Sequence, residues 1–170
     1  IKIGSNNPSD DIKRIAAVRK AIGPNYKLMV DGNGKWDLKT ALAFSSRLDD
    51  YDLFWFEEPL YFDDLMSHIT LSEEMKTPIA LGEQLYSKWH FNAFIEMGAV
   101  QFVQPDALRV AGISEWLEVA YQAYASNLPV APHVGDMMQV HVHTSLAHPS
   151  CNLLEYIPWT RHCFVEPATV

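Results

Sequence analysis

The sequence predicts an α/β fold of the (β/α)8 barrel class, a TIM-like barrel of which this chain holds a part. Short apolar segments alternate with amphipathic segments of helical periodicity, and an acid or a histidine follows each apolar segment. These polar residues follow one another at spacings of 26, 26, 23, 27 and 22 residues, and they are Asp31, Glu57, Glu83, Asp106, His133 and Glu155. Each spacing is about the length of one strand, one helix and two loops. Repeated strand–helix units with a polar group at the same strand end are typical of a parallel barrel.

The chain is too short for a complete barrel. A full (β/α)8 barrel needs about 250 residues, so the 170 residues hold about six and a half strand–helix units. No linker or low-complexity segment divides them, and we therefore predict a single barrel domain over residues 1–170. The chain starts without a methionine in a segment that resembles the end of a strand, so we expect the first strands to precede Ile1.

Local signals place the individual elements. The run Phe54-Trp55-Phe56 is the clearest strand, because only burial on both faces tolerates three adjacent large aromatic side chains. The predicted strands cover residues 28–31, 54–57, 79–83, 100–104, 128–133 and 151–155. The predicted helices follow the caps Ser9 or Asp10, Asp37, Asp63 or Asp64, and Ser87, and two more cover residues 112–127 and 137–147.

Composition limits the partners of the chain. With 48% apolar and 20% charged residues, it has enough material for a globular core. The net charge of −8 argues against nucleic acid as a partner, because phosphate binding needs clustered Lys and Arg. We see no membrane-spanning apolar run and no signal peptide. Cys151 and Cys163 form no Cys-x-x-Cys pair, which favours a reducing, cytoplasmic location.

Three acids at successive strand ends predict a metal site. Asp31, Glu57 and Glu83 leave equivalent ends of neighbouring parallel strands, which lie about 4.8 Å apart. Three carboxylates that converge need a cation to stay ionised, and an all-oxygen site favours Mg²⁺ before Mn²⁺ or Ca²⁺. Zinc is disfavoured, because no Cys or His belongs to the trio. The alternative is that each acid only caps the helix that follows it.

Asp106 and His133 follow the next two strands and suggest a general base. A carboxylate that accepts a hydrogen bond from one imidazole nitrogen, at about 2.6–3.2 Å, fixes the tautomer and raises the basicity of the other nitrogen. The alternative is an ordinary histidine after a proline-rich strand. Structural roles are expected for His68, His90, His141, His143, His148 and His162. His141 and His143 form a weak zinc signal, but a helix would point them apart.

Seven short motifs together resemble the enolase superfamily, specifically its mandelate racemase branch. The resemblance covers nearly the whole chain and keeps the order and spacing of the motifs. Each motif alone is weak, and they are Lys2-Ile3-Gly4, Val30-Asp31-Gly32-Asn33, Phe56-Glu57-Glu58-Pro59, Leu81-Gly82-Glu83, Gln104-Pro105-Asp106, Ala131-Pro132-His133 and Leu154-Glu155-Tyr156. The resemblance implies a modified, enolase-type barrel, with an α+β capping domain that this chain lacks.

The resemblance also implies roles for the site residues. It assigns Mg²⁺ binding to Asp31, Glu57 and Glu83, and a His-Asp dyad to Asp106 and His133. Glu155 matches the acid that hydrogen-bonds the substrate carboxylate, and Lys2 matches the second lysine of a Lys-x-Lys motif on the opposite face. Asn33 matches a position where the family often has a polar group that contacts substrate or metal, and Arg109, three residues after Asp106, matches a position where the racemase has a lysine. We predict substrate binding for both, although purely structural roles explain these two residues equally well.

The shared chemistry of this branch is proton abstraction next to a carboxylate. The product is an enediolate with two negative charges, which a divalent metal and a nearby proton donor stabilise. The resemblance favours an acid-sugar dehydratase, a hydro-lyase acting on a small sugar acid, in which His133 takes the α-proton and protonates the departing hydroxyl. The alternatives are a racemase, epimerase or cycloisomerase that uses Lys2, a non-catalytic barrel that binds a metal-chelated acid, and a metal-dependent aldolase. We also expect a homo-oligomer.

Overall fold

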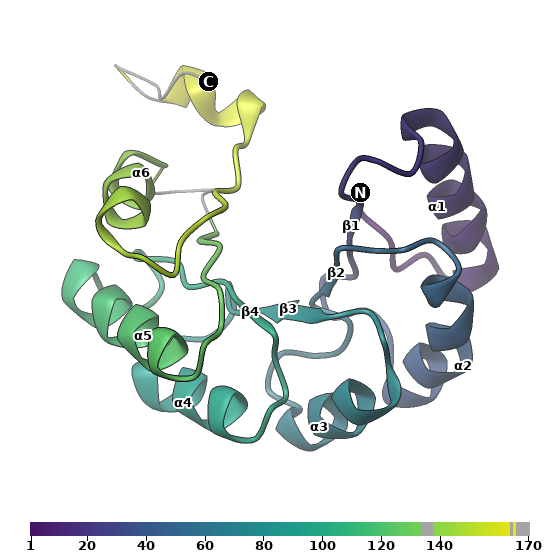
Figure 1. Ribbon diagram of the computed structural model, residues 1–170, viewed down its shortest axis with the longest axis horizontal. Coiled ribbons are helices and arrows are strands. Elements are labelled where there is room, and N and C mark those ends of the chain that lie inside the picture. Colours follow the sequence, from purple (N-terminus) through teal and green to yellow (C-terminus); the bar gives the residue numbers. More distant parts are fainter. Residues whose placement is uncertain (134–137, 164, 166–170) are drawn as a thin grey trace. The chain divides into compact units, whose positions relative to one another are not determined.

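Helices and short strands alternate along the computed structural model, which describes residues 1–133, 138–163 and 165 (Figure 1). The helices are α1 (Pro8–Ile22), α2 (Leu38–Asp49), α3 (Leu65–Glu74), α4 (Lys88–Glu96), α5 (Ile113–Ala125) and α6 (Met138–Ala147). The strands are β1 (Met29–Asp31), β2 (Trp55–Glu57), β3 (Ile79–Leu81) and β4 (Phe102–Val103), and a 3-10 helix, η1, covers Pro158–Cys163. No helix among the described residues is both long and apolar enough to span a membrane.

The chain forms two compact units. The first contains Ile1–Leu81 and Met97–Gln101, and the second contains Gly82–Glu96 and the described residues from Phe102 onward. The first unit therefore carries α1 to α3 with β1 to β3, and the second carries α4 to α6 with β4. The predicted single domain over residues 1–170 stays a prediction, and the units are described separately below.

The first unit is built on three parallel strands. β1 pairs with β2 and β2 pairs with β3, and Asp31 lies directly opposite Glu57 in this register. Lys2 makes one further parallel bridge to Asp31, on the edge preceding β1. β2 and β3 are buried on both faces as expected, since each of their residues is buried, whereas Met29 at the start of β1 is partly exposed.

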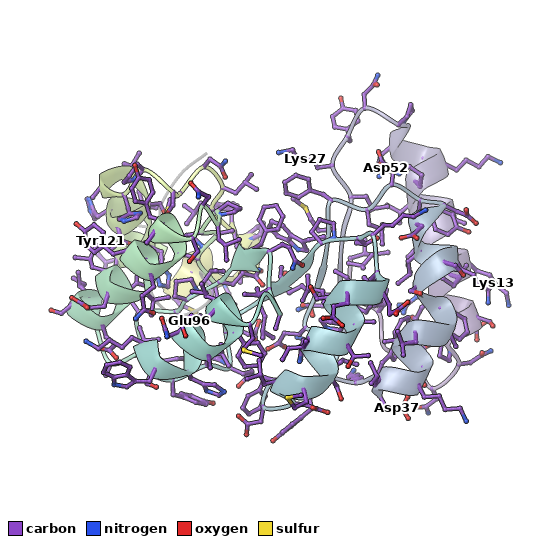
Figure 2. All side chains as sticks on the ribbon, turned by 60° about the horizontal axis from the view of Figure 1, so that its bottom comes forward. Lys13, Lys27, Asp37, Asp52, Glu96 and Tyr121 are labelled. Carbon is purple, nitrogen blue, oxygen red and sulfur yellow. The ribbon has the colours of Figure 1, made fainter. Side chains whose placement is uncertain are left out.

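Helices cover these strands and complete the core. α1 packs against α2, and α2 against α3, outside the strands (Figure 1). Ile15, Leu48 and Leu71 point inward with no exposed surface, and each contributes about 1.5–3 kcal/mol of hydrophobic stabilisation. The opposite faces are charged, and Figure 2 shows Lys13 of α1 pointing outward, where it pairs with Asp10 at 2.8 Å.

The helix caps confirm most of the predicted boundaries. Asp37 accepts from Thr40 N–H and Asp64 accepts from Ser67 N–H, as N-cap side chains do. The prediction for α1 was wrong by two or three residues, because Asn7 rather than Ser9 or Asp10 is its N-cap. Pro8 is tolerated at the first helical position, where its missing N–H would have no partner in the helix.

The second unit has fewer regular strands than predicted. Around 128–133 and 151–155 only single parallel bridges form, from Val130 to Val103 and to Cys151. Val130 N–H donates to Ser150 O and Ala131 N–H donates to Val103 O, but Pro129 and Pro132 have no N–H. The prolines on either side therefore interrupt the ladder. Helix α6 begins at Met138, and the predicted start at 137 lies outside the described residues.

Candidate active site

Two predicted metal-ligand acids lie side by side in the first unit. Asp31 ends β1, Glu57 ends β2, and the parallel register pairs them directly. Both side chains are nearly buried, with exposed fractions of 7% and 9%. Because paired positions on adjacent strands are about 4.8 Å apart, the two carboxylates form an acidic pair that positive charge stabilises.

Donors from the same unit contact this acidic pair. The ammonium group of Lys2 forms an ion pair with Asp31. The backbone N–H of Asn33, a residue with a positive φ of 44°, donates to Asp31 Oδ1 at 2.8 Å. Trp55 Nε1 donates to Glu57 Oε2 at 3.2 Å. The structure therefore brings four predicted site residues together here, namely Lys2, Asp31, Asn33 and Glu57.

Backbone hydrogen bonds continue beyond these strands into the turns that follow them. Gly32 N–H donates to Glu57 O and Gly34 N–H donates to Glu58 O, each at 2.9 Å. Glu58 N–H in turn donates to Ala80 O at 3.0 Å. We call these three bonds the turn ladder. It holds the residues after Asp31 and Glu57 in fixed register.

The predicted dyad is present in the second unit. His133 Nδ1 lies 2.7 Å from Asp106 Oδ2, within the distance expected for a carboxylate–imidazole hydrogen bond. Asp106 has no exposed surface. Since an ionised carboxylate only accepts, the proton of this bond is on Nδ1, and Nε2 carries the lone pair of the neutral ring. The pair has the geometry of a general base with an orienting acid.

Glu83 and Arg109 border the dyad. His133 Nε2 lies 3.5 Å from Glu83 Oε2. Arg109 Nη1 donates to the backbone oxygen of Glu83 at 2.9 Å and lies 3.8 Å from its Oε1. Arg109 Nε is also 4.0 Å from Asp106 Oδ2. Arg109 thus contacts both acids of this cluster, and its predicted contact with substrate stays a prediction.

The charges of this cluster shift the proton affinities of both dyad members. Burial alone would raise the pKa of Asp106, but hydrogen bonds from His133 and from Leu108 N–H outweigh burial and hold that pKa below its ordinary value. Burial alone would lower the pKa of His133. The hydrogen bond to Asp106 and the charges of Glu83 and Glu155 outweigh it and raise the pKa of His133. Glu155 is therefore close enough to act on His133 electrostatically.

His141, a further residue beside the dyad, was expected to be structural. Its imidazole is fully buried, its Nε2 accepts from Ala107 N–H at 2.9 Å, and the same atom lies 3.9 Å from Asp106 Oδ1. Burial lowers the pKa of His141 to about 4, so the ring is neutral. The only sequence signal is its position eight residues after His133, on the next predicted helix, and this does not distinguish it from His143.

The predicted metal ligands fit a hard cation by their chemistry. Each is a nearly buried carboxylate at or just beyond the end of a strand, and each contacts a donor of its own unit, Lys2 for Asp31, Trp55 for Glu57, and Arg109 for Glu83. None points into open solvent. No group of three or more His, Cys, Asp or Glu side chains within residues 1–133, 138–163 and 165 is arranged to hold a metal ion. The donor set is nevertheless all oxygen, which suits Mg²⁺.

Parallel strand–helix units with acids at the strand ends, followed by a His-Asp dyad, define a (β/α)8 barrel of the enolase type. The family described as "Enolase C-terminal domain-like" matches residues 1–170, and the chain belongs to this family. The resemblance stated from the motifs and the predicted fold class are both confirmed.

Several relatives have names that describe sugar-acid chemistry. L-talarate/galactarate dehydratase from Salmonella typhimurium is 40% identical over 166 residues, which are 98% of this chain and 41% of that protein. The crystal structure of L-talarate dehydratase from Polaromonas sp., complexed with Mg and L-glucarate, is 37% identical with a TM-score of 0.90, over 98% of this chain and 46% of that one. A 3,6-anhydro-alpha-L-galactonate cycloisomerase from Streptomyces coelicolor is 31% identical over 87% of this chain and 41% of that protein. The chain thus spans less than half the length of these relatives.

Proposed function

We propose that the protein containing this chain is a Mg²⁺-dependent dehydratase of a sugar acid, an aldonate or an aldarate. The observation that carries the proposal is the hydrogen bond of 2.7 Å between His133 Nδ1 and the buried Asp106. It leaves Nε2 as the basic atom of the pair. Two relatives named as dehydratases, matched over 98% of the chain, support dehydration as the outcome.

His133 acts twice in the proposed reaction. Its Nε2 takes the proton from the carbon next to the substrate carboxylate, and the electrons of that C–H bond form an enediolate. The C–O bond at the next carbon then breaks, and the proton on Nε2 moves to the departing hydroxyl, which leaves as water. The remaining enol tautomerises to a 2-keto-3-deoxy acid. Asp106 keeps the ring in one tautomer and stabilises the imidazolium between the two steps.

The other candidate residues hold and orient the substrate. Asp31, Glu57 and Glu83 would bind Mg²⁺, whose positive charge offsets the second negative charge that develops on the substrate carboxylate. Glu155 in its ionised form contributes to the raised pKa of His133, whereas a hydrogen bond from Glu155 to the substrate carboxylate needs its protonated form as the donor. Asn33 lies beside Asp31, and Arg109 lies beside Glu83. We propose that Asn33 and Arg109 orient these two metal ligands or contact substrate.

A second candidate function is racemisation, epimerisation or cycloisomerisation by the same enediolate chemistry. Lys2 favours it, because an ammonium group beside Asp31, 66% exposed, can serve as a second acid or base on another face of the substrate. The cycloisomerase relative shows that this family also includes proteins named for that outcome. A non-catalytic barrel that binds a metal-chelated acid is the third candidate. A homo-oligomer in the cytoplasm remains part of the proposal.

The test uses the full-length protein and a library of aldonic and aldaric acids. With Mg²⁺ present, we expect one or a few substrates to give 2-keto-3-deoxy acids, which are detected as their semicarbazones. His133→Asn is the matched variant, because it removes the base but leaves the three carboxylates in place. Racemised or cyclised products without keto acid would support the second candidate. Absence of both turnover and α-proton exchange in deuterated water would support the binding barrel.

A further inference from the structure

Each backbone N–H group of residues 107–110, the turn that follows Asp106, donates a hydrogen bond. Leu108 N–H donates to Asp106 Oδ1 at 2.8 Å, and Arg109 and Val110 donate their N–H groups to Asp106 O at 3.0 and 2.9 Å. The remaining N–H of this turn, that of Ala107, donates to His141 Nε2 at 2.9 Å and to no backbone oxygen of the described residues. Ala107 is 1% exposed, so water does not replace that acceptor.

The hydrogen bond fixes the tautomer of His141. Since Nε2 accepts from Ala107, the ring proton lies on Nδ1, and this atom is buried without a hydrogen-bond partner among the described residues. A buried N–H without a partner is costly, and native proteins contain few of them. An apolar side chain of similar size would avoid this cost. It could not accept from Ala107 N–H, however, and the histidine supplies that acceptor.

We propose that His141 is a positioning residue for the dyad: it holds the Asp106–Ala107 peptide so that Asp106 Oδ2 faces His133 Nδ1. This inference rests on the proposed function and adds a residue to its machinery. His141 touches neither substrate nor the reacting atoms and acts through Asp106. The low pKa that burial gives to its imidazole keeps Nε2 available as an acceptor.

The geometry explains why an acceptor is needed at this point. The two oxygens of Asp106 already have separate donors, Leu108 N–H for Oδ1 and His133 for Oδ2. If Ala107 N–H lost its acceptor, Asp106 Oδ1, 3.9 Å from His141 Nε2, would be a nearby oxygen for it to approach. Such a rotation of the carboxylate would lengthen the bond to His133. His141 prevents it by accepting from Ala107.

Three substitutions of His141 separate this role from simple packing. His141→Gln can place an acceptor oxygen near the position of Nε2, whereas His141→Asn places one near Nδ1, and His141→Leu has none. We expect kcat to fall by about 10- to 100-fold in the Asn and Leu variants, the size of effect expected when a reacting group shifts by about an ångström. KM and Mg²⁺ affinity should stay unchanged, and the Gln variant should recover most of the lost kcat.

His148 is the matched control for loss of a buried imidazole. It is 3% exposed and also has a buried Nε2 without a partner among the described residues, but its Nδ1 contacts Ser150, and its ring packs against Trp116, Tyr121 and Tyr124. We expect His148→Leu to lower the melting temperature and to leave kcat unchanged. Comparing His148→Leu with His141→Leu therefore separates a loss of stability, which both variants can show, from a loss of turnover, which we expect only in His141→Leu.

Hydrogen exchange tests the same inference without substrate. The amide of Ala107 should exchange faster in the His141→Leu and His141→Asn variants of the full-length protein than in the wild type or His141→Gln, as measured by mass spectrometry of the peptide that contains it. Unchanged exchange in folded His141→Leu protein would overturn the inference, and so would wild-type kcat in that variant. If the wild type dehydrates no sugar acid, the proposed function fails, and the exchange result alone then decides whether His141 holds this peptide.

Discussion

Replacing Gly82 by alanine should destabilise the protein strongly, because this glycine lies against the backbone of a neighbouring segment. A Cβ atom added to Gly82 would lie 2.6 Å from the carbonyl carbon and oxygen of Gln104 and 2.8 Å from its nitrogen. Backbone atoms cannot move aside as the end of a flexible side chain can. The φ of Gly82 is also +155°, a conformation that costs a residue with a Cβ about 1–3 kcal/mol. Overpacking adds about 1–3 kcal/mol, so the total loss is about 2–6 kcal/mol.

Gly98→Ala is the matched control. Gly98 also has a positive φ, of +67°, but nothing lies within 4 Å of an added Cβ. Gly98→Ala should therefore lower the free energy of unfolding only by the cost of a left-handed backbone conformation, about 1–2 kcal/mol. Thermal unfolding of the full-length protein, followed by circular dichroism, should give a clearly larger drop in melting temperature for Gly82→Ala. Equal drops in the two variants would refute the argument from close contact, and turnover should fall only in Gly82→Ala, since Gly82 precedes Glu83.

Three further predictions concern the dyad, the metal and the response to acid. His133→Asn should lower kcat by about 10²–10⁴-fold, the usual worth of a general base, with an unchanged circular dichroism spectrum, and near wild-type turnover would exclude the proposed mechanism. Glu57→Gln should weaken Mg²⁺ binding measured by calorimetry. Trp55→Phe, which removes the hydrogen bond to Glu57 and keeps an aromatic ring, should weaken it less, and the reverse order would contradict the assignment. Asp11 should stabilise the fold at neutral pH, because hydrogen bonds from Arg14 and Ser5 outweigh burial and hold its pKa below the ordinary value of 3.8. This stabilisation is complete above pH 3.8 and is lost as pH falls through the pKa of Asp11 in the folded state. The difference in denaturation midpoint between wild type and Asp11→Asn should therefore shrink in acid. A difference that stays constant would show that folding does not lower the pKa of Asp11.

Local sequence signals were sufficient for the parts of the structure that local chemistry determines. Asp37 and Asp64 cap their helices because short carboxylate side chains reach the N–H groups of the first turn. The run of aromatics ending at Phe56 predicted a buried strand, and Phe56 has no exposed surface. The contact between Asp106 and His133 followed from their places at successive strand ends. The roles of these residues in catalysis stay predictions.

The failures have a different physical origin. A regular strand around Val130 did not form, because the apolar pattern reports burial and not the missing N–H groups of the flanking prolines, and Cys151 makes a single bridge to Val130. His141 was missed because its acceptor role depends on Ala107, 34 positions earlier in the chain. No periodicity links two such residues. The position of Arg109 between Glu83 and Asp106 likewise depends on tertiary structure, and no local sequence pattern predicts it.

The turn ladder limits where this protein can acquire a new specificity. Segments after strands are usually the variable part of a barrel, where insertions change the ligand. Here the N–H groups of Gly32, Gly34 and Glu58 are bonded to the neighbouring backbone, so one inserted residue would break these bonds directly after the paired Asp31 and Glu57. Insertion libraries placed at residues 32–35 should therefore yield inactive clones. Selection for a new ligand should therefore change side chains around the acidic pair of Asp31 and Glu57, or segments that the turn ladder does not hold.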